Sequence, residues 1–339
     1  VDDLIGYDFF TGFGGNPGIW PGEDGSGPDT DPKDFNGHGT HIAGIVAAMN
    51  NNAAGVTGGV GGWYGGNRAF RGVRIMCLRV GATANDGLGY VNSTNCGQAI
   101  LYAADNGASV INASWGSQSN PQMTAGMAAA TAAGVSVFHA AGNDNQNAPS
   151  YLDLLGDDVV TVAATTVSDA KWSASNWGAE VDVSAPGVDI LSTVSIPPYL
   201  PNYQSYSGTS MAAPNAGAVA LLIKSMMPSL TRLQIDSILM ATVDNIDAIN
   251  PSWIGLIGSG RVDADNAANA LACARFSADV TEGPAPLTVN FTDLSPNSPV
   301  SWDWTFGTGD GSISQNPSYV YNNPGIYSVS LKIDENHPL

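Results

Sequence analysis

Short apolar runs alternate with longer apolar stretches at helical spacing, and this alternation most constrains the fold. The runs and stretches follow one another in the order strand, helix, strand, helix, strand, strand, at 73–80, 97–106, 110–113, 122–133, 135–140 and 159–164. Continuous apolar strands separated by helices are typical of a parallel sheet covered on both faces. The sequence therefore predicts an α/β domain with a parallel sheet and helices on both faces.

The pattern changes near residues 271–276. Beyond this point helical spacing disappears, and short alternating runs separated by Gly, Pro and Asn take its place, at 287–291, 301–306, 319–320 and 326–333. Such runs are typical of a small all-β sandwich. We therefore expect two domains, an α/β domain over 1–272 and a β-sandwich over 274–339.

The charge balance excludes some classes of function. The net charge is −19, and the four lysines are scattered at positions 33, 171, 224 and 332. Without a basic stripe, nucleic acid is not an expected partner. No apolar run in the sequence is long enough to cross a bilayer, so the chain is not expected to span a membrane.

The three cysteines leave two alternatives open. Cys77 lies in a strand-like run and Cys96 opens a predicted helix, so the two could form a disulfide and leave Cys273 unpaired. Three buried thiols would fit the sequence equally well.

Gly208 to Pro214 form a small, Gly-led turn that presents Ser210, followed by an apolar stretch at helical spacing over 216–227. This places Ser210 in the first turn of a helix, where free backbone N–H groups favour developing negative charge. Ser210 is therefore a candidate nucleophile. The alternative is an ordinary helix N-cap.

Two further candidate catalytic residues lie next to predicted elements, one at the start of a helix and one after a strand. His38 lies in Asn36–His41 at the entry to a helical stretch, which suits a general base, although His38 and His41 are also spaced as a metal pair. Asn143 follows the predicted strand 135–140, where its amide could donate to an oxyanion or simply form a turn. We interpret His139, just before it, as a buried histidine with satisfied hydrogen bonds.

Taken together, these stretches resemble the subtilisin-like serine peptidases, or subtilases. The matching segments run in register over residues 1–272, and they are NGHGTHIAG (36–44), GVRIMCLRV (72–80), GASVINASWGS (107–117), GVSVFHAAGN (134–143), VVTVAATT (159–166), VDVSAPGVDILST (181–193), YSGTSMAAPNAGAVALL (206–222) and GSGRVDADNAANAL (258–271). The resemblance implies a serine endopeptidase that acts on polypeptides through an acyl-enzyme and needs no cofactor for catalysis. Ser210 would be the nucleophile, His38 the general base and acid, and Asn143 the oxyanion donor.

The resemblance also assigns residues to substrate binding. The segment Gly87, Leu88, Gly89 would pair with the substrate backbone as an added strand. The segment Ser114, Trp115, Gly116 would pair on the other side and form a wall of the primary specificity pocket. Trp115 stands where the family usually has a smaller aliphatic or a similar aromatic residue, which leaves the side-chain preference open.

One family feature is missing. Subtilases carry their catalytic Asp in an Asp-Thr-Gly motif upstream of the histidine, and this sequence has no such motif. Asp2, Asp3 and Asp8 match the segment that follows the motif in the family, so they do not fit the role. Because the chain begins at Val1 without Met or a start-like segment, we expect the Asp to lie upstream of Val1. The alternative is that the protein has lost it and is a non-catalytic surface or assembly protein.

Two structural features are implied as well. Asn51 and Asn52 resemble part of the family's calcium loop, and Asp2 and Asp3 resemble the end of an acidic loop, so structural calcium is one expectation and an ordinary Asn/Gly turn is the other. An α/β-hydrolase is excluded, because Ser210 lies in G-T-S-M-A rather than G-x-S-x-G and the histidine precedes it.

The C-terminal region resembles a PKD domain, an immunoglobulin-like β-sandwich. The resemblance rests on GPAPLTVNF (283–291), WDWTFG (302–307), Asn316-Pro317 and the run from Tyr321 through PGIY (324–327). Period-2 spacing predicts that its aromatic residues are mostly core. In secreted peptidases such domains are associated with insoluble protein or polysaccharide, or act as spacers. We therefore expect a secreted or cell-surface protein whose PKD domain attaches it to a substrate or surface.

Overall fold

The computed structural model describes residues 5–13, 18–63, 72–147, 149–194, 202–271, 274–295 and 299–334. The chain divides into two compact units, Val1–Ala264 and Asp265–Leu339. Asp2, Asp3 and Cys273 lie outside the described residues.

A four-stranded parallel sheet forms the centre of the first unit. Its strands lie in the order β5 (Val110–Ala113), β6 (Ser136–Ala140), β7 (Val160–Thr165) and β8 (Val183–Pro186), all parallel. All residues of β6 and β7 are buried, as expected for apolar runs covered on both faces. The predicted parallel sheet is confirmed, and β5 has the predicted bounds.

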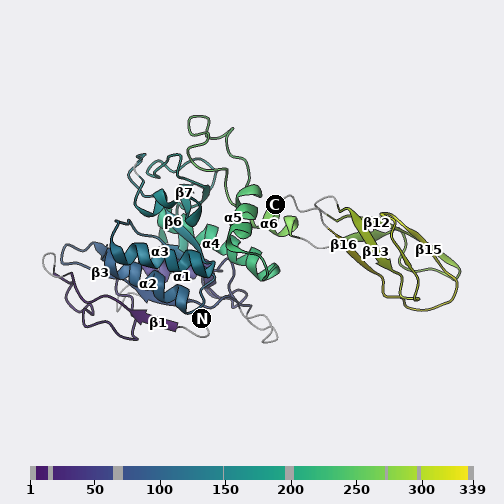
Figure 1. The fold of residues 1–339 in the computed structure, drawn as a ribbon, viewed down its shortest axis with the longest axis horizontal. Helices are drawn as coiled ribbons and strands as arrows, with labels where there is room; N and C mark the ends of the chain where they lie inside the picture. Colours follow the sequence, from purple (N-terminus) through teal and green to yellow (C-terminus); the bar gives the residue numbers. More distant parts are fainter. Residues whose placement is uncertain are drawn as a thin grey trace. The chain divides into compact units, whose positions relative to one another are not determined.

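Helices cover both faces of this sheet (Figure 1). Val137 of β6 packs in one core with α2 (Ser93–Asp105) and α3 (Pro121–Ala133). The next residue, Phe138, faces the opposite way and lies against Gly217 of α4 (Thr209–Met226). Because successive strand residues alternate between faces, α4 covers the side of the sheet opposite to α2 and α3.

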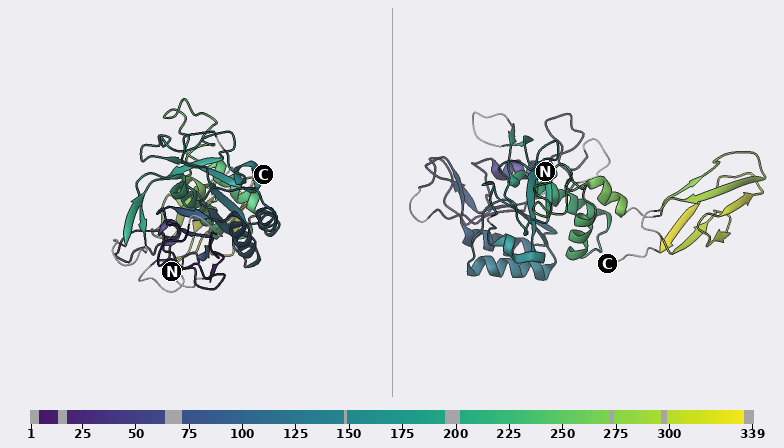
Figure 2. Two further views of the ribbon diagram at one scale, coloured as in Figure 1. Left: turned by 90° about the vertical axis from the view of Figure 1, so that its left-hand side faces the viewer. Right: turned by 90° about the horizontal axis from the view of Figure 1, so that it is seen from above.

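Glycines allow α2 and α3 to pack with their backbones in contact. A Cβ on Gly97 would lie 2.3 Å from the Met123 backbone nitrogen, and one on Gly126 would lie 2.3 Å from the Gly97 carbonyl oxygen. No side chain fits at either position without moving a backbone. The two helices run side by side in each view (Figures 1 and 2).

The remaining elements of this unit are short. A separate parallel pair joins β1 (Ile5–Asp8) to β2 (Met76–Arg79), and two antiparallel pairs join β3 (Gly81–Thr83) to β4 (Gly89–Val91) and β9 (Ile190–Thr193) to β10 (Tyr203–Tyr206). The other helices of this unit are α1 (His38–Ala47), the 3₁₀ helix η1 (Leu152–Asp158) and α5 (Arg232–Ala241), and α6 (Ala264–Ala270) begins at the last residue of this unit and otherwise belongs to the second.

The second unit contains two three-stranded antiparallel sheets, in agreement with the expected sandwich. Their orders are β11-β12-β15 and β14-β13-β16, with bounds Phe276–Ala278, Leu287–Asp293, Ser318–Tyr321, Gly311–Ser312, Ser301–Thr305 and Ser330–Asp334. Trp304 and Tyr321 are buried in its core, and Trp302, Tyr319 and Tyr327 pack against them. These aromatic side chains therefore form a core, as predicted.

The two cysteines that the structure describes, Cys77 and Cys96, are free thiols. The disulfide alternative is therefore wrong for this pair. Burial raises the pKa of the Cys96 thiol to about 12, which leaves it protonated and unreactive. Among the described helices, none is both long and apolar enough to cross a bilayer.

Candidate active site

Ser210 is the second residue of α4, in the first turn, as predicted. The N-cap is Gly208, and no side chain caps the helix there, so the alternative of Ser210 as an N-cap is wrong. Pro214 has no backbone N–H, so the carbonyl of Ser210, four residues earlier, has no partner within the helix. That carbonyl instead accepts a hydrogen bond from the Ser114 hydroxyl at 2.9 Å. The Ser210 hydroxyl remains accessible and lies 3.5 Å from the Ser114 carbonyl oxygen.

Asn143 is oriented by the residue before the serine. Its side-chain oxygen accepts from both the backbone N–H and the hydroxyl of Thr209, each at 2.9 Å, and the Thr209 hydroxyl accepts from Gly142 N–H at 3.1 Å. With the oxygen held in this way, the amide nitrogen is the free end of the side chain. No acceptor for it lies among the described residues, so it can donate to a bound oxyanion next to Ser210.

His38 is the first residue of α1, and Asp34 organises the turn that leads into it. One oxygen of the Asp34 carboxylate accepts from the backbone N–H groups of Asn36 and Gly37, at 2.9 and 2.8 Å. The other accepts from the backbone N–H and the hydroxyl of Thr40, at 2.8 and 2.7 Å. Because these four bonds use both oxygens, Asp34 fixes the position of His38 without bonding to the imidazole.

Electrostatics favour a neutral His38. Burial is the main effect and lowers the pKa of His38 below its usual value, the charge of Asp34 acts in the opposite direction, and His41 adds a smaller lowering effect. A neutral imidazole can accept a proton as a general base. Among the described residues, no carboxylate accepts a hydrogen bond from His38.

His41 does not form a metal pair with His38. It is fully buried, its Nε2 lies 3.0 Å from the carbonyl oxygens of both Ile190 and Gln204, and its ring stacks on Tyr206 at 4.4 Å between centroids. Within the described ranges, no cluster of three His, Cys, Asp or Glu residues could hold a metal ion. The metal alternative for the HxxH pair therefore has no support.

A cavity of about 1430 Å³ lies next to His38. Strand β2 forms one side and β5 the other, while α1 and α4 lie over one face and α2 over the opposite face. Within the described part of the chain, β2 pairs only with β1 and β5 only with β6, so the edges that β2 and β5 turn toward the cavity have no strand partner.

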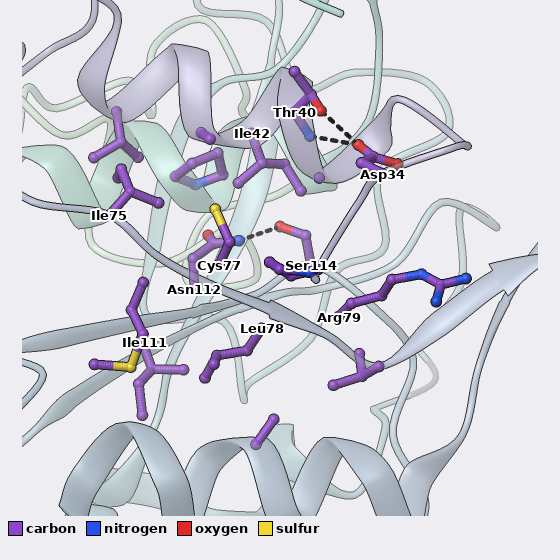
Figure 3. Close-up of a pocket in the computed structure, with 18 of the residues that line it drawn as sticks. Asp34, Thr40, Ile42, Ile75, Cys77, Leu78, Arg79, Ile111, Asn112 and Ser114 are labelled. Atoms are coloured by element: carbon purple, nitrogen blue, oxygen red, sulfur yellow. Dashed lines mark hydrogen bonds between the residues drawn. The ribbon is translucent and has the colours of Figure 1, made fainter. Parts of the chain in front are cut away.

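The lining of this cavity is mostly apolar (Figure 3). Cys77 and Leu78 of β2 point to opposite sides of their strand, and Ile111 and Asn112 lie across from them on β5. Ser114, Trp115 and Gly116, which follow the carboxyl end of β5, line the same cavity as His38. The cavity therefore runs between the two strands and reaches the candidate base at their carboxyl ends.

The predicted substrate-binding segments are placed as follows. Ser114 contacts Ser210 directly, and Trp115 and Gly116 continue from it. Gly89 begins β4 and lines the cavity. Gly87 and Leu88 form the preceding turn, with 59% of Leu88 exposed. Hydrogen bonds thus join Ser114 to Ser210 and Asn143 to Thr209, the residue before Ser210, and His38 lies at the cavity that residues 114–116 share.

Sequence reasoning missed Thr209 and Asp34, which orient Asn143 and the turn before His38. Both are polar residues close to candidate residues, and polar residues beside a helix start are a signal for caps and turns. The partners of Asp34 are only two to six residues away, whereas Thr209 and Asn143 are 66 residues apart, so their contact cannot be read from the sequence.

Of the four residues proposed for calcium, the structure describes Asn51 and Asn52. The Asn52 side-chain oxygen accepts from the backbone N–H of Ala54 at 3.1 Å, which is an ordinary turn. Asn51 adopts a positive φ of 57°. Calcium prefers several carboxylate oxygens, and Asp2 and Asp3 lie outside the described residues. Two amides alone do not fit the ion.

A parallel α/β sheet, a serine at a helix N-terminus, an oriented amide beside that helix start and a histidine whose pKa is lowered by burial are features that serine hydrolases share. A Subtilase family model matches residues 19–272, and a PKD domain model matches residues 266–337. The chain belongs to the subtilase family and carries a PKD domain.

Curated relatives agree with this assignment. The chain is 35% identical over 295 residues to the "Extracellular protease" of Xanthomonas campestris pv. campestris, covering 79% of this chain and 48% of that protein. It is 35% identical over 237 residues to "Thermitase" of Thermoactinomyces vulgaris, covering 70% of this chain and 76% of that protein. The chain therefore spans about half the length of the first of these relatives.

Solved structures are similar as well. A protease from Pseudoalteromonas arctica superposes with a TM-score of 0.64 at 29% identity, covering 79% of this chain and 84% of that one. A cold-adapted subtilisin-like serine proteinase superposes with a TM-score of 0.54 at 31% identity, covering 71% of this chain and 82% of that one.

Proposed function

We propose that this chain belongs to a serine endopeptidase, with Ser210 as nucleophile, His38 as general base and Asn143 as oxyanion donor. The observation that carries the proposal is the pair of hydrogen bonds from Thr209 to the Asn143 side-chain oxygen, which aims an amide donor at the space beside Ser210. An ordinary turn asparagine has no need of this orientation.

The reaction would proceed in two halves. His38 accepts the Ser210 hydroxyl proton as the oxygen attacks the peptide carbonyl, and the Asn143 amide and the Ser210 backbone N–H donate to the oxyanion. The oxyanion then collapses, the C–N bond breaks, and His38 passes its proton to the leaving amine. Water, deprotonated by His38, attacks the acyl-enzyme in the same way and releases the acid.

The carboxylate that would pair with His38 is absent from the described residues, and the cavity between β2 and β5 supports a place for it. Both strand edges facing the cavity are without a strand partner in the described part, and the lining is mostly apolar. An extended segment with alternating apolar side chains could pair with β2 on one side and with β5 on the other. It would thereby join the pair β1-β2 and the sheet β5-β6-β7-β8 into one sheet. We assign this cavity to a parallel strand that carries the catalytic Asp.

The direction of this strand fixes where its acid would lie. A strand parallel to β5 ends at the edge where Ser114 and Trp115 line the cavity together with His38. A carboxylate just past its carboxyl end therefore faces the imidazole, where it would hold the tautomer and stabilise the imidazolium. Asp34 does not take this role, because its four hydrogen bonds commit it to the turn before α1.

Labelling with a fluorophosphonate probe tests the proposal. The full-length precursor is expected to react at Ser210, and Ser210→Ala is expected to abolish the label. A protein that begins at Val1 is expected to react about 10⁴-fold more slowly than the precursor, in line with the loss when the carboxylate of a related triad is removed. Absence of label in the precursor would favour the non-catalytic surface or assembly protein instead.

Further parts of the proposal rest on relatives and domain type. The similarity to an extracellular protease supports a secreted or cell-surface location. The PKD domain supports attachment to insoluble protein or polysaccharide. Structural calcium would require the segment that contains Asp2 and Asp3, in addition to the loop with Asn51 and Asn52.

A further inference from the structure

His139 lies in β6, four residues before Asn143, and connects two distant parts of the unit. Its Nδ1 lies 2.6 Å from a carboxylate oxygen of Asp153, in η1. Its Nε2 lies 2.8 Å from the carbonyl oxygen of Trp115, in the segment that follows β5. The side chains of His139 and Asp153 are only 1% and 2% exposed, so neither group exchanges its partner for water.

Both ring nitrogens of His139 have polar partners. The Trp115 carbonyl only accepts hydrogen bonds, so Nε2 donates to it, while Nδ1 shares a hydrogen bond with the Asp153 carboxyl group. The imidazole therefore bridges Asp153 and the backbone of Trp115.

Asp153 is itself held in place. The oxygen that faces His139 also accepts from the Thr161 hydroxyl at 3.0 Å, and the other oxygen accepts from the Ser150 backbone N–H at 2.6 Å. Asp153 is the titratable group that faces the ring, and Asp182, just before β8, interacts electrostatically with Asp153. The Trp115 indole meets the His139 ring edge to face, with centroids 6.2 Å apart.

Resting on the proposed peptidase function, we propose that His139 is a positioning residue for substrate recognition. Held by Asp153, it fixes the Trp115 carbonyl and thereby the segment Ser114–Gly116 that would line the pocket for the substrate side chain. Because Ser114 also bonds to Ser210, this segment is held at two successive residues, by α4 at Ser114 and by the buried His139–Asp153 pair at Trp115. Loss of the His139 side chain releases the middle of the segment.

The first test needs no activity. In the full-length protein labelled with 5-fluorotryptophan, the ¹⁹F signal of Trp115 is expected to shift in His139→Phe, because the Trp115 carbonyl loses its donor, and to stay near its wild-type position in Thr161→Val. A Trp115 signal that His139→Phe leaves unchanged would overturn the proposal.

The second test uses peptide substrates that differ only in the side chain before the scissile bond. His139→Phe keeps a ring of similar size but donates no hydrogen bond, and it is expected to raise KM about tenfold for large side chains while kcat changes by less than about twofold. Thr161→Val is the matched control, because it removes a bond to Asp153 and leaves His139 its two partners. Equal KM values in His139→Phe and the wild type would refute the role.

The two proposals fail in different ways. If the wild-type precursor takes no fluorophosphonate label, the peptidase function is wrong, and the magnetic resonance experiment still decides whether His139 holds Trp115. If the label appears and the KM values for the peptide substrates are the same in His139→Phe and the wild type, the positioning role is wrong and the peptidase function stands.

Discussion

The Ser114 hydroxyl donates to the carbonyl of Ser210 at 2.9 Å, and Pro214 is the reason that this carbonyl is free to accept it. A proline four residues after the nucleophile removes the N–H that would otherwise close the helix turn. The bond therefore joins the segment proposed to bind substrate to the helix that carries the candidate nucleophile, and it fixes their relative position.

Ser114→Ala is expected to destabilise the unit by about 1–3 kcal/mol, because it leaves a largely buried carbonyl without a donor. In a Pro214→Ala background the new backbone N–H can donate to Ser210, so the same change should cost less. Urea unfolding of the wild type, both single variants and the double variant measures this coupling. If the losses in free energy of unfolding of the two single variants add up in the double variant, the Ser114 bond does not depend on the proline.

Asn143→Ala should slow acylation without unfolding the chain. Removing one such donor in subtilisin, a member of the same family, costs about 10²–10³ in kcat, and the same range is expected for the complete protein here. The readout is the rate of p-nitroanilide hydrolysis, with the melting temperature as the control for folding.

Thr209→Val tests how much the orientation of the Asn143 amide contributes to kcat, because the amide itself is still present in this variant. This variant keeps the Thr209 backbone N–H bond to Asn143 and loses the hydroxyl bond, so its loss in kcat should be real but smaller than that of Asn143→Ala. A loss as large as that of Asn143→Ala, at unchanged melting temperature, would mean that Thr209 does more than orient the amide.

On the acidic side of the pH–rate profile, the rise in the rate of Ser210 labelling is expected to follow the deprotonation of His38. Because burial lowers the pKa of His38 in the chain that begins at Val1, the slow Ser210 labelling of that protein is expected to rise at pH values below the usual titration range of histidine. Asp34 raises the pKa of His38, so Asp34→Asn should move this rise to still lower pH. Thr40→Val, which removes a hydroxyl from the same turn but no charge, is the control. A rise that moves to higher pH in Asp34→Asn would contradict this electrostatic account.

Local sequence determined some elements well and others poorly. The run 110–113 became β5 with unchanged bounds, because the turn at Asn106 and Gly107 precedes it, a polar segment follows it, and it begins with the β-branched residues Val110 and Ile111. The helix expected at 97–106 begins at Ser93 instead, since Asn92 caps it through the backbone N–H of Thr94. The polar residues of that first turn have no apolar spacing to reveal them.

The site shows the same division. His38, Asn143 and Ser210 were chosen from short motifs, whereas the groups that orient them depend on contacts across long stretches of chain. Asp153 reaches His139 from 14 residues away, and Ser114 reaches Ser210 from 96. Such pairs are created by the sheet, which brings the carboxyl ends of its strands to one edge, and a single sequence carries no record of them.

Asp182 should make the folded state less stable as the pH rises. Burial, with a further contribution from Asp236, Asp157 and Asp153, raises the pKa of Asp182 to about 6, whereas the unfolded chain has lost this proton near pH 3.9. Between these values the folded chain binds more protons than the unfolded chain, so this group's contribution to the free energy of unfolding falls from about pH 4 to about pH 6.

Asp182→Asn tests this directly. The amide oxygen can still accept from the Thr161 backbone N–H, which the carboxylate meets at 2.7 Å, so the substitution removes the titration and keeps that bond. The variant is expected to match the wild type near pH 4 and to exceed its stability increasingly up to pH 6, with a constant difference above that. Urea midpoints at pH 4, 5, 6 and 7 measure it, and Asp31→Asn, at an exposed position, controls for the loss of one negative charge. If the variant gained no stability between pH 4 and 6, Asp182 would have to be ionised throughout and stabilised by contacts other than those described.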